Sequence, residues 1–195
     1  TGVGGTGKTR LALQVGGEVL ERFADGVWLI ELAPVADPAQ VPNTVAAALS
    51  VREEPGRALR DTLVDHLREQ AALLILDNCE HLLVACAELA EHLLRQCRSL
   101  CILATSREAL GIPGEVAWSV PSLTLPPTDG DLVAVLQSEA AQLFIERAAV
   151  ANRAFAGTPD NAPAVAQICR RLDGIPLALE LAAGRIRSLR VEEVA

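Results

Sequence analysis

Nine residues at the start of the sequence, "GVGGTGKTR", combine glycines with a lysine and a threonine at spacings that suit phosphate binding. The pattern G-x-x-x-x-G-K-[ST], which surrounds the phosphates of a nucleoside triphosphate, is formed by Gly2, Gly7, Lys8 and Thr9. The pattern G-x-G-x-x-G, a weaker signal that is typical of dinucleotide-binding folds, is formed by Gly2, Gly4 and Gly7. The rest of the sequence has to distinguish a nucleoside triphosphate from a dinucleotide as the ligand.

Two features favour the triphosphate. Lys8 and Thr9 directly follow the last glycine, and an ammonium group with a Mg²⁺-binding hydroxyl has no purpose in a dinucleotide turn. Asp77 ends the apolar stretch "LLILD", where an acid at the carboxyl end of a buried strand can hold Mg²⁺. Asp77 could instead cap the next helix. Glu31 ends another predicted strand and keeps the dinucleotide alternative open, because an acid there could bind ribose hydroxyls.

The predicted site divides the work between main chain and side chains. Glycines let backbone N–H groups turn toward an anion, and a helix that begins near Lys8 adds its positive N-terminal dipole. Lys8 would neutralise phosphate oxygens, while Thr9 and Asp77 are the predicted Mg²⁺ ligands. The loop residues predicted to bind nucleotide are Gly2, Gly4, Gly5, Thr6, Gly7, Lys8, Thr9 and Arg10.

Composition excludes several classes of protein. The 195 residues are 50% hydrophobic, and their net charge of −8 argues against direct nucleic-acid binding by this segment. No apolar run approaches the ~20 residues of a membrane span, so we expect no membrane contact and a cytoplasmic location. Five cysteines without a C-x-x-C pair indicate neither a disulfide framework nor a zinc site. The start on a phosphate loop, without Met, suggests a piece of a longer protein that lacks the preceding strand.

The periodicity of apolar residues predicts an α/β fold: a parallel sheet with helices on both faces, followed by a small helical domain. We place the nucleotide-binding domain at 1–125 and the helical domain at 126–195, because "TLPPTDGD" interrupts periodicity. Strands are predicted at 27–33, 72–78 and 99–107. Helices are predicted at 8–23, within 37–51 and 57–70, at 80–96, and at 138–151, 161–173 and 175–188.

Four motifs in this order resemble the NB-ARC group of STAND signal-transduction ATPases, as found in bacterial transcriptional regulators of LuxR and SARP type. They are "GVGGTGKTR", "LLILDNCEH", "ILATSREAL" and "GIPLALEL", and they span nearly the whole chain. The resemblance implies ATP or ADP with Mg²⁺ as ligands. It also implies that the partners are other domains of the same protein, such as a winged helix and DNA-binding or sensor domains.

The resemblance assigns further residues. Arg107 matches the arginine that senses the γ-phosphate, although Thr105-x-x-Glu108 could also be a capping box that leaves Arg107 in the first turn of a helix. Pro176 matches a proline that packs against adenine, and it could equally begin a helix. Asn78 departs from the family, because many members carry a second acid there. Either Glu80 polarises the attacking water or hydrolysis is slow.

Three functions remain at this point. The first is a nucleotide-dependent switch with slow ATPase activity, in which Lys8, Asp77, Glu80 and Arg107 carry the chemistry. The second is a scaffold that binds ADP without hydrolysing ATP, which Asn78 favours. A phosphotransferase is the third, and it would need an acceptor pocket and an arginine-rich lid that the scattered arginines do not indicate.

Overall fold

The computed structural model describes residues 1–128 and 132–195. Contacts divide the chain into two compact units: Thr1–Gly2 with Lys8–Ser119, and Val3–Gly7 with Val120–Ala195. The division at residue 125 stays a prediction, because the end of "TLPPTDGD" at 129–131 lies outside the described residues. Each unit has its own apolar core, so each is described by itself.

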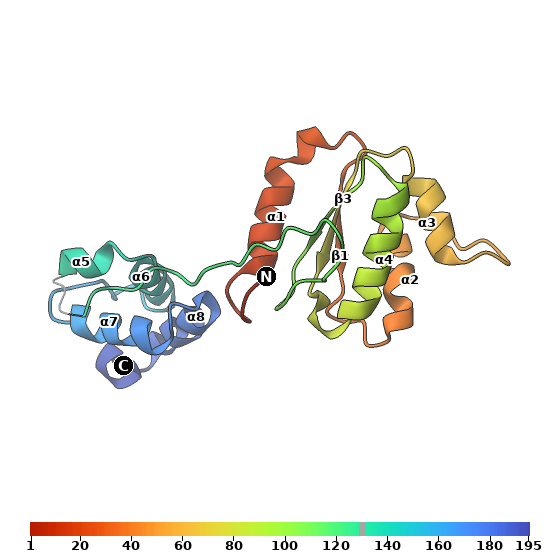
Figure 1. Ribbon diagram of the computed structural model, residues 1–195. Helices are drawn as coiled ribbons and strands as arrows, with labels where there is room; N and C mark the ends of the chain where they lie inside the picture. Colours follow the sequence, from red (N-terminus) through yellow and green to blue (C-terminus); the bar gives the residue numbers. More distant parts are fainter. Residues whose placement is uncertain (129–131) are drawn as a thin grey trace. The chain divides into compact units, whose positions relative to one another are not determined.

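A three-stranded parallel sheet forms the centre of the first unit (Figure 1). Its strands are β1 (Val27–Glu31), β2 (Leu73–Asp77) and β3 (Cys101–Ala104), in the order β1-β2-β3. All five residues of β2 are buried, as expected of a central strand flanked on both sides. The three predicted strands and the α/β fold class are therefore confirmed, with strands shorter than the sequence suggested.

Alternate residues of β2 serve two different cores, because successive side chains point to opposite faces of a sheet. Leu74 and Leu76 belong to the larger core, which packs against helices on one face. Leu73 and Ile75 pack on the other face against Ala12 of the first helix. Figure 1 shows one helix on this face of the sheet and three helices on the opposite face. The helices of the larger core are α2 (Val41–Ala48), α3 (Leu59–Leu67) and α4 (Leu83–Gln96), and the opposite face carries α1 (Lys8–Glu18).

The helix predicted at 8–23 ends earlier than expected. α1 stops at Glu18, and a 3-10 helix at Leu20–Arg22 continues it. α1 approaches the sheet closely at Gly16, where an added Cβ would lie 2.8 Å from Ile75 Cδ1. A residue larger than glycine would require Ile75 to move.

The buried cysteines act as small apolar side chains, as their helical spacing predicts. Cys86 is fully buried in α4. Cys79, which precedes this helix in the sequence, and Cys97, which directly follows it, are also buried. In the second unit, burial raises the pKa of the Cys169 thiol to about 11. This thiol is therefore neutral at physiological pH.

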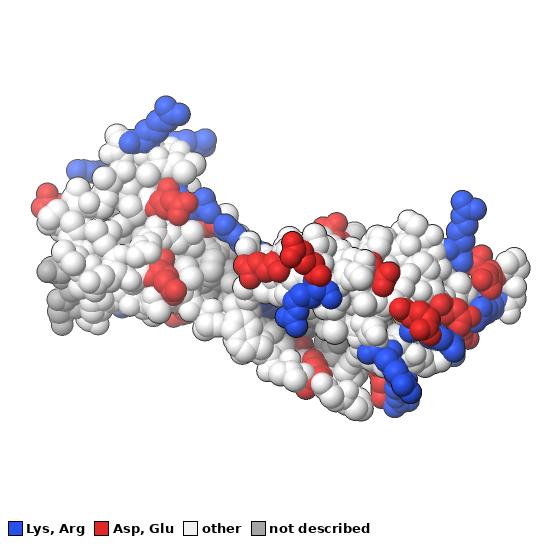
Figure 2. All heavy atoms as spheres, turned by 90° about the horizontal axis from the view of Figure 1, so that it is seen from above, with Lys and Arg blue, Asp and Glu red and all other residues white. Residues whose placement is uncertain are grey.

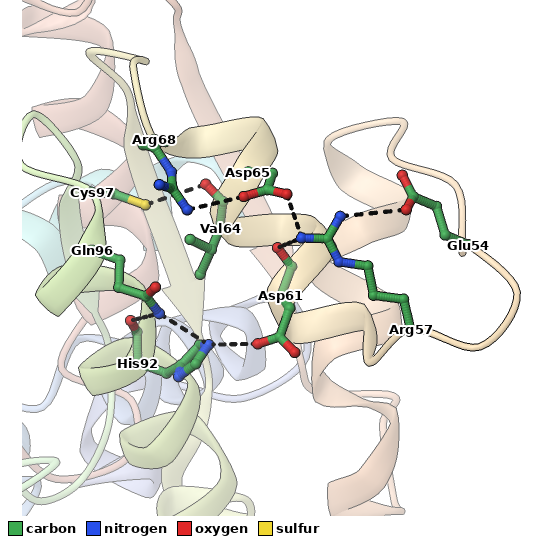
Figure 3. A network of polar contacts seen from close by, with 9 residues as sticks. All are labelled: Glu54, Arg57, Asp61, Val64, Asp65, Arg68, His92, Gln96 and Cys97. Atoms are coloured by element: carbon green, nitrogen blue, oxygen red, sulfur yellow. Dashed lines mark hydrogen bonds and ion pairs between the residues drawn. The ribbon is translucent and has the colours of Figure 1, made fainter.

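Polar contacts join α3 to α4, and they also join α3 to the segment that precedes it, which includes Glu54 and Arg57 (Figure 3). His92 of α4 lies 3.2 Å from the Asp61 carboxylate of α3. Arg57 pairs with Asp65, and this hydrogen bond lowers the pKa of the Asp65 carboxyl below its usual value. Within the segment that precedes α3, Arg57 also pairs with Glu54. Water and salt screen such exposed pairs, so they position the loop more than they stabilise the fold.

The second unit is helical. Phe144 is fully buried in its core and meets the ring of Phe155 edge to face, with ring centroids 6.3 Å apart. Its helices are α5 (Leu132–Leu136), α6 (Glu139–Ala151), α7 (Ala162–Arg171), α8 (Pro176–Gly184), a 3-10 helix at Arg185–Arg187 and α9 (Val191–Val194). Among the described residues, no helix has the length and apolar character to cross a bilayer.

The helices α6, α7 and α8 confirm the sequence prediction for this unit. Gly174 follows α7 with a φ of 64°, and its N–H donates to the carbonyl of Cys169. Such a left-handed residue commonly ends a helix. Pro176 is the first residue of α8, where a missing N–H costs nothing. The sequence pattern missed α5 and α9, which have only five and four residues.

Candidate nucleotide-binding site

The glycine-rich loop adopts backbone conformations that few other residues tolerate. Gly2, Gly5 and Gly7 have φ values of 141°, 82° and 89°. A Cβ at Gly7 would meet nothing within 4 Å, so backbone conformation rather than space demands glycine there. The Thr6 hydroxyl donates to the carbonyl of Val3 at 3.0 Å and braces the loop from within. The glycine spacing thus corresponds to a real turn of the main chain.

The loop leads directly into α1, whose first residue is Lys8. Its ammonium group donates to the Gly2 carbonyl at 2.8 Å, so the lysine folds back over the loop. α1 has no acidic residue in its first turn, which leaves its positive N-terminal end available to an anion. Lys8 is also the only lysine in the sequence.

Asp77 is the centre of the side-chain arrangement. It ends β2, and the residue as a whole is only 8% exposed. One oxygen, Oδ1, accepts hydrogen bonds from the hydroxyls of Thr9 at 2.7 Å and Thr105 at 2.5 Å. The structure therefore brings together Thr9 and Asp77, which lie 68 positions apart in sequence.

The alternative role of Asp77 as a helix cap is not what the structure shows. The next helix is the short 3-10 helix Cys79–His81, and its N-cap is Asn78, which makes no capping hydrogen bond with its side chain. The Asp77 carboxylate is instead used by the two hydroxyls.

Glu80 and Arg107 also meet. Arg107 Nε lies 3.3 Å from Glu80 Oε1, and the arginine side chain is 69% exposed. The other oxygen, Glu80 Oε2, is buried and has no hydrogen-bond partner among the described residues. The capping-box alternative for Arg107 is wrong, because residues 105–110 form no helix. Arg107 instead lies in an irregular segment after β3.

The remaining predicted residues lie on or near the loop. Gly4 and Arg10 are exposed. Gly5 groups with the second unit, where its carbonyl accepts from the Leu177 N–H at 3.1 Å. Pro176, which precedes Leu177, is half-buried at the start of α8. Its helix-starting role is confirmed, and its contact with adenine stays a prediction.

The sequence pattern does not predict one residue of the site, Thr105. The sequence pattern indicates Thr105 only as a possible helix cap, whereas in the structure its hydroxyl donates to Asp77. A polar residue immediately after a buried strand was the available signal, since strand ends of one parallel sheet meet at the same edge.

The donor atoms suit Mg²⁺. Thr9 supplies a hydroxyl oxygen and Asp77 a carboxylate oxygen, and Mg²⁺ prefers such hard oxygen ligands. Both hydroxyls that donate to Asp77 are neutral, so a cation would balance the charge of this buried carboxylate. These residues fit the ion that the loop pattern implies.

Charged side chains are mixed on the face shown in Figure 2, where lysine and arginine do not gather into a continuous basic stripe. A basic face is what binding along a nucleic-acid backbone requires. The face drawn in Figure 2 therefore has no such basic surface, and the net charge of the chain is −8.

Comparison with known proteins gives related sequences over the whole chain. An HTH-type transcriptional regulator of Mycobacterium tuberculosis, so named provisionally, is 45% identical over 194 residues. A Mycobacterium bovis protein with the same provisional description is equally similar. An uncharacterized protein of M. tuberculosis is 44% identical over 194 residues. All of this chain is covered in each case, but it spans only 20% of the two regulators and 47% of the third protein.

The family comparison covers the phosphate loop and the sheet. Residues 1–112 match the AAA domain, which is more than half of the 195 residues. The matched range includes the glycine-rich loop, all three strands, and the Thr9, Asp77 and Thr105 cluster. The chain therefore belongs to the AAA domain family of P-loop proteins.

Proposed function

We propose that this chain is the ATP- and ADP-binding module of a nucleotide-dependent switch of the NB-ARC or STAND type. The observation that carries the proposal is the contact between the Thr9 hydroxyl and the Asp77 carboxylate at the end of the glycine-rich loop. A triphosphate needs a cation beside its anion-binding loop, and this pair offers the oxygen ligands for it. Bound Mg²⁺ would neutralise phosphate charge.

The similar proteins support a role inside a larger regulator. Two of them carry names that describe HTH-type transcriptional regulators, and this chain is similar to only 20% of each. We infer that nucleotide binding here serves DNA-binding or sensor domains elsewhere in such a protein. The segment itself would not contact nucleic acid.

Glu80 and Arg107 suggest how the module could respond to nucleotide. Oε2 of Glu80 is buried without a hydrogen-bond partner among the described residues, so it can accept a hydrogen bond from water. Arg107 holds the other oxygen, and its exposed side chain has the planar donor fork that suits phosphate. If Arg107 turned toward phosphate, it would release Glu80 to act as a base.

The energetic demand on such a switch is modest. To move the population ratio of two conformations from 1:99 to 99:1, a ligand must bind the favoured conformation with a free energy about 5.5 kcal/mol better than the other. Hydrogen bonds to charged groups contribute about 1.5–3 kcal/mol each, so an arginine contact and a few loop contacts to one phosphate reach this range.

A scaffold that holds ADP without hydrolysis is the second candidate. Asn78 favours it, because an amide cannot take a proton from water and it occupies the position after Asp77. In this structure Asn78 has a left-handed backbone, with φ of 67°. The two candidates differ in turnover and agree on nucleotide binding.

Replacing Lys8 tests the phosphate site. Lys8→Ala removes the only lysine and should weaken binding of ATP with Mg²⁺ by at least about tenfold, since a charged hydrogen bond contributes about 1.5–3 kcal/mol. Titration calorimetry measures this change. Arg98→Ala, at an exposed residue after α4, is the control. If Lys8→Ala bound ATP with the same affinity as the native chain, the loop would not be the phosphate-binding site.

Replacing Glu80 separates the switch with slow ATPase activity from the scaffold. Glu80→Gln keeps the shape of the side chain but removes the base, so steady-state release of phosphate should fall by about 100-fold while ATP affinity stays unchanged. Glu88→Gln, at an exposed position of α4, is the matched control. Native turnover in Glu80→Gln would contradict the assigned role, and absence of turnover in the native chain would favour the scaffold.

Replacing Arg107 tests the sensing role. Arg107→Ala should reduce the preference for ATP over ADP by about tenfold, because only ATP presents the third phosphate. Competition between the two nucleotides with Mg²⁺ present provides the measurement, with Arg98→Ala again as control. If the ratio of affinities were the same in native protein and Arg107→Ala, this arginine would not read the phosphate.

A further inference from the structure

Thr105 makes an unusually dense set of contacts with the end of β2. Its N–H donates to the Leu76 carbonyl at 2.9 Å, and its carbonyl accepts from the Cys79 N–H at 2.9 Å. Its hydroxyl donates to Asp77 Oδ1 at 2.5 Å and accepts from the Asn78 N–H at 2.9 Å. Thr105 therefore contacts all four residues from Leu76 to Cys79, and it is 5% exposed.

These contacts hold a conformation that the segment would not favour alone. Asn78 has φ of 67° and ψ of 51°, a left-handed backbone conformation that residues other than glycine adopt only occasionally. Its N–H is fixed by the Thr105 hydroxyl. The turn at Asn78 sets the direction in which the chain continues to Glu80.

The threonine hydroxyl also has a defined direction. A hydroxyl has one proton, and the short distance to Asp77 Oδ1 indicates that Thr105 gives its proton to the carboxylate. Its lone pairs then face the Asn78 N–H. Thr9, the second donor to the same oxygen, is itself assigned to the cation, so Thr105 is the contact that orients Asp77 without being a ligand.

We infer that Thr105 is a positioning residue for Mg²⁺ binding, which acts by fixing the Asp77 carboxylate and the turn after it. This inference rests on the proposed nucleotide site. Groups that orient a metal ligand commonly change metal affinity by about 10–100-fold when they are removed. The effect should therefore appear in the dependence of nucleotide binding on Mg²⁺, before any chemistry occurs.

The test compares three variants with the native chain. Thr105→Val keeps the branched shape and removes the hydroxyl, while Thr105→Ser keeps the hydroxyl. Thr62→Val is the matched control, because Thr62 of α3 is 7% exposed and its hydroxyl has no hydrogen-bond partner among the described residues. ATP binding is measured by fluorescence of a labelled ATP analogue over a series of Mg²⁺ concentrations, and nucleotide binding in EDTA is measured in parallel.

We expect Thr105→Val to raise the half-saturating Mg²⁺ concentration about tenfold and to leave binding in EDTA unchanged. Thr105→Ser should return the Mg²⁺ dependence to within about twofold of native, and Thr62→Val should match native. Thermal unfolding monitors the fold, and if Thr105→Val does not fold, Thr105→Ala compared with Thr105→Ser gives the same contrast.

Three results would overturn the inference. Native Mg²⁺ dependence in Thr105→Val would show that the hydroxyl does not act on the cation. Equal defects in Thr105→Ser and Thr105→Val would assign the effect to packing. ATP binding by the native chain that is independent of Mg²⁺ would remove both this inference and the proposed function.

Discussion

The site depends on one buried carboxylate, that of Asp77, and on the hydroxyls that hold it. A charged group taken out of water is costly unless it is paired or hydrogen-bonded. Here β2 carries Asp77 to the edge of the sheet with 8% exposure, and Thr9 and Thr105 both donate to one of its oxygens. The two donors come from α1 and from the end of β3. This single group thereby links the start of α1 to two strand ends of the sheet.

The fold supplies that arrangement through the pattern of β2. Its apolar residues alternate between α1 on one face and the helices of the larger core on the other, so the strand is fixed from both sides. Because the strands are parallel, their carboxyl ends lie at one edge, where Asp77 and Thr105 meet. Asp77 and Thr105 thus lie at the ends of two paired strands, while Arg107 lies in the irregular segment that follows β3.

Much of this was predictable from sequence because the signals were local. The apolar run that ends in Asp77 predicted a central strand, and the loop glycines predicted a turn that the positive φ values confirm. The features that the sequence did not predict include a contact between residues that lie far apart along the chain. The bond from Thr105 to Asp77 spans 28 positions, and "TSRE" matched a capping box as well as a strand end. Helices of four and five residues, α9 and α5, are too short to show periodicity.

The central claim, that the loop with Asp77 binds a nucleoside triphosphate and its cation, is tested most directly by one calorimetric comparison. ATP and NAD are titrated into the native chain in the presence of Mg²⁺, and ATP is titrated again in EDTA. We expect saturable ATP binding that weakens in EDTA, and no binding of NAD. Binding of NAD instead of ATP would contradict the account.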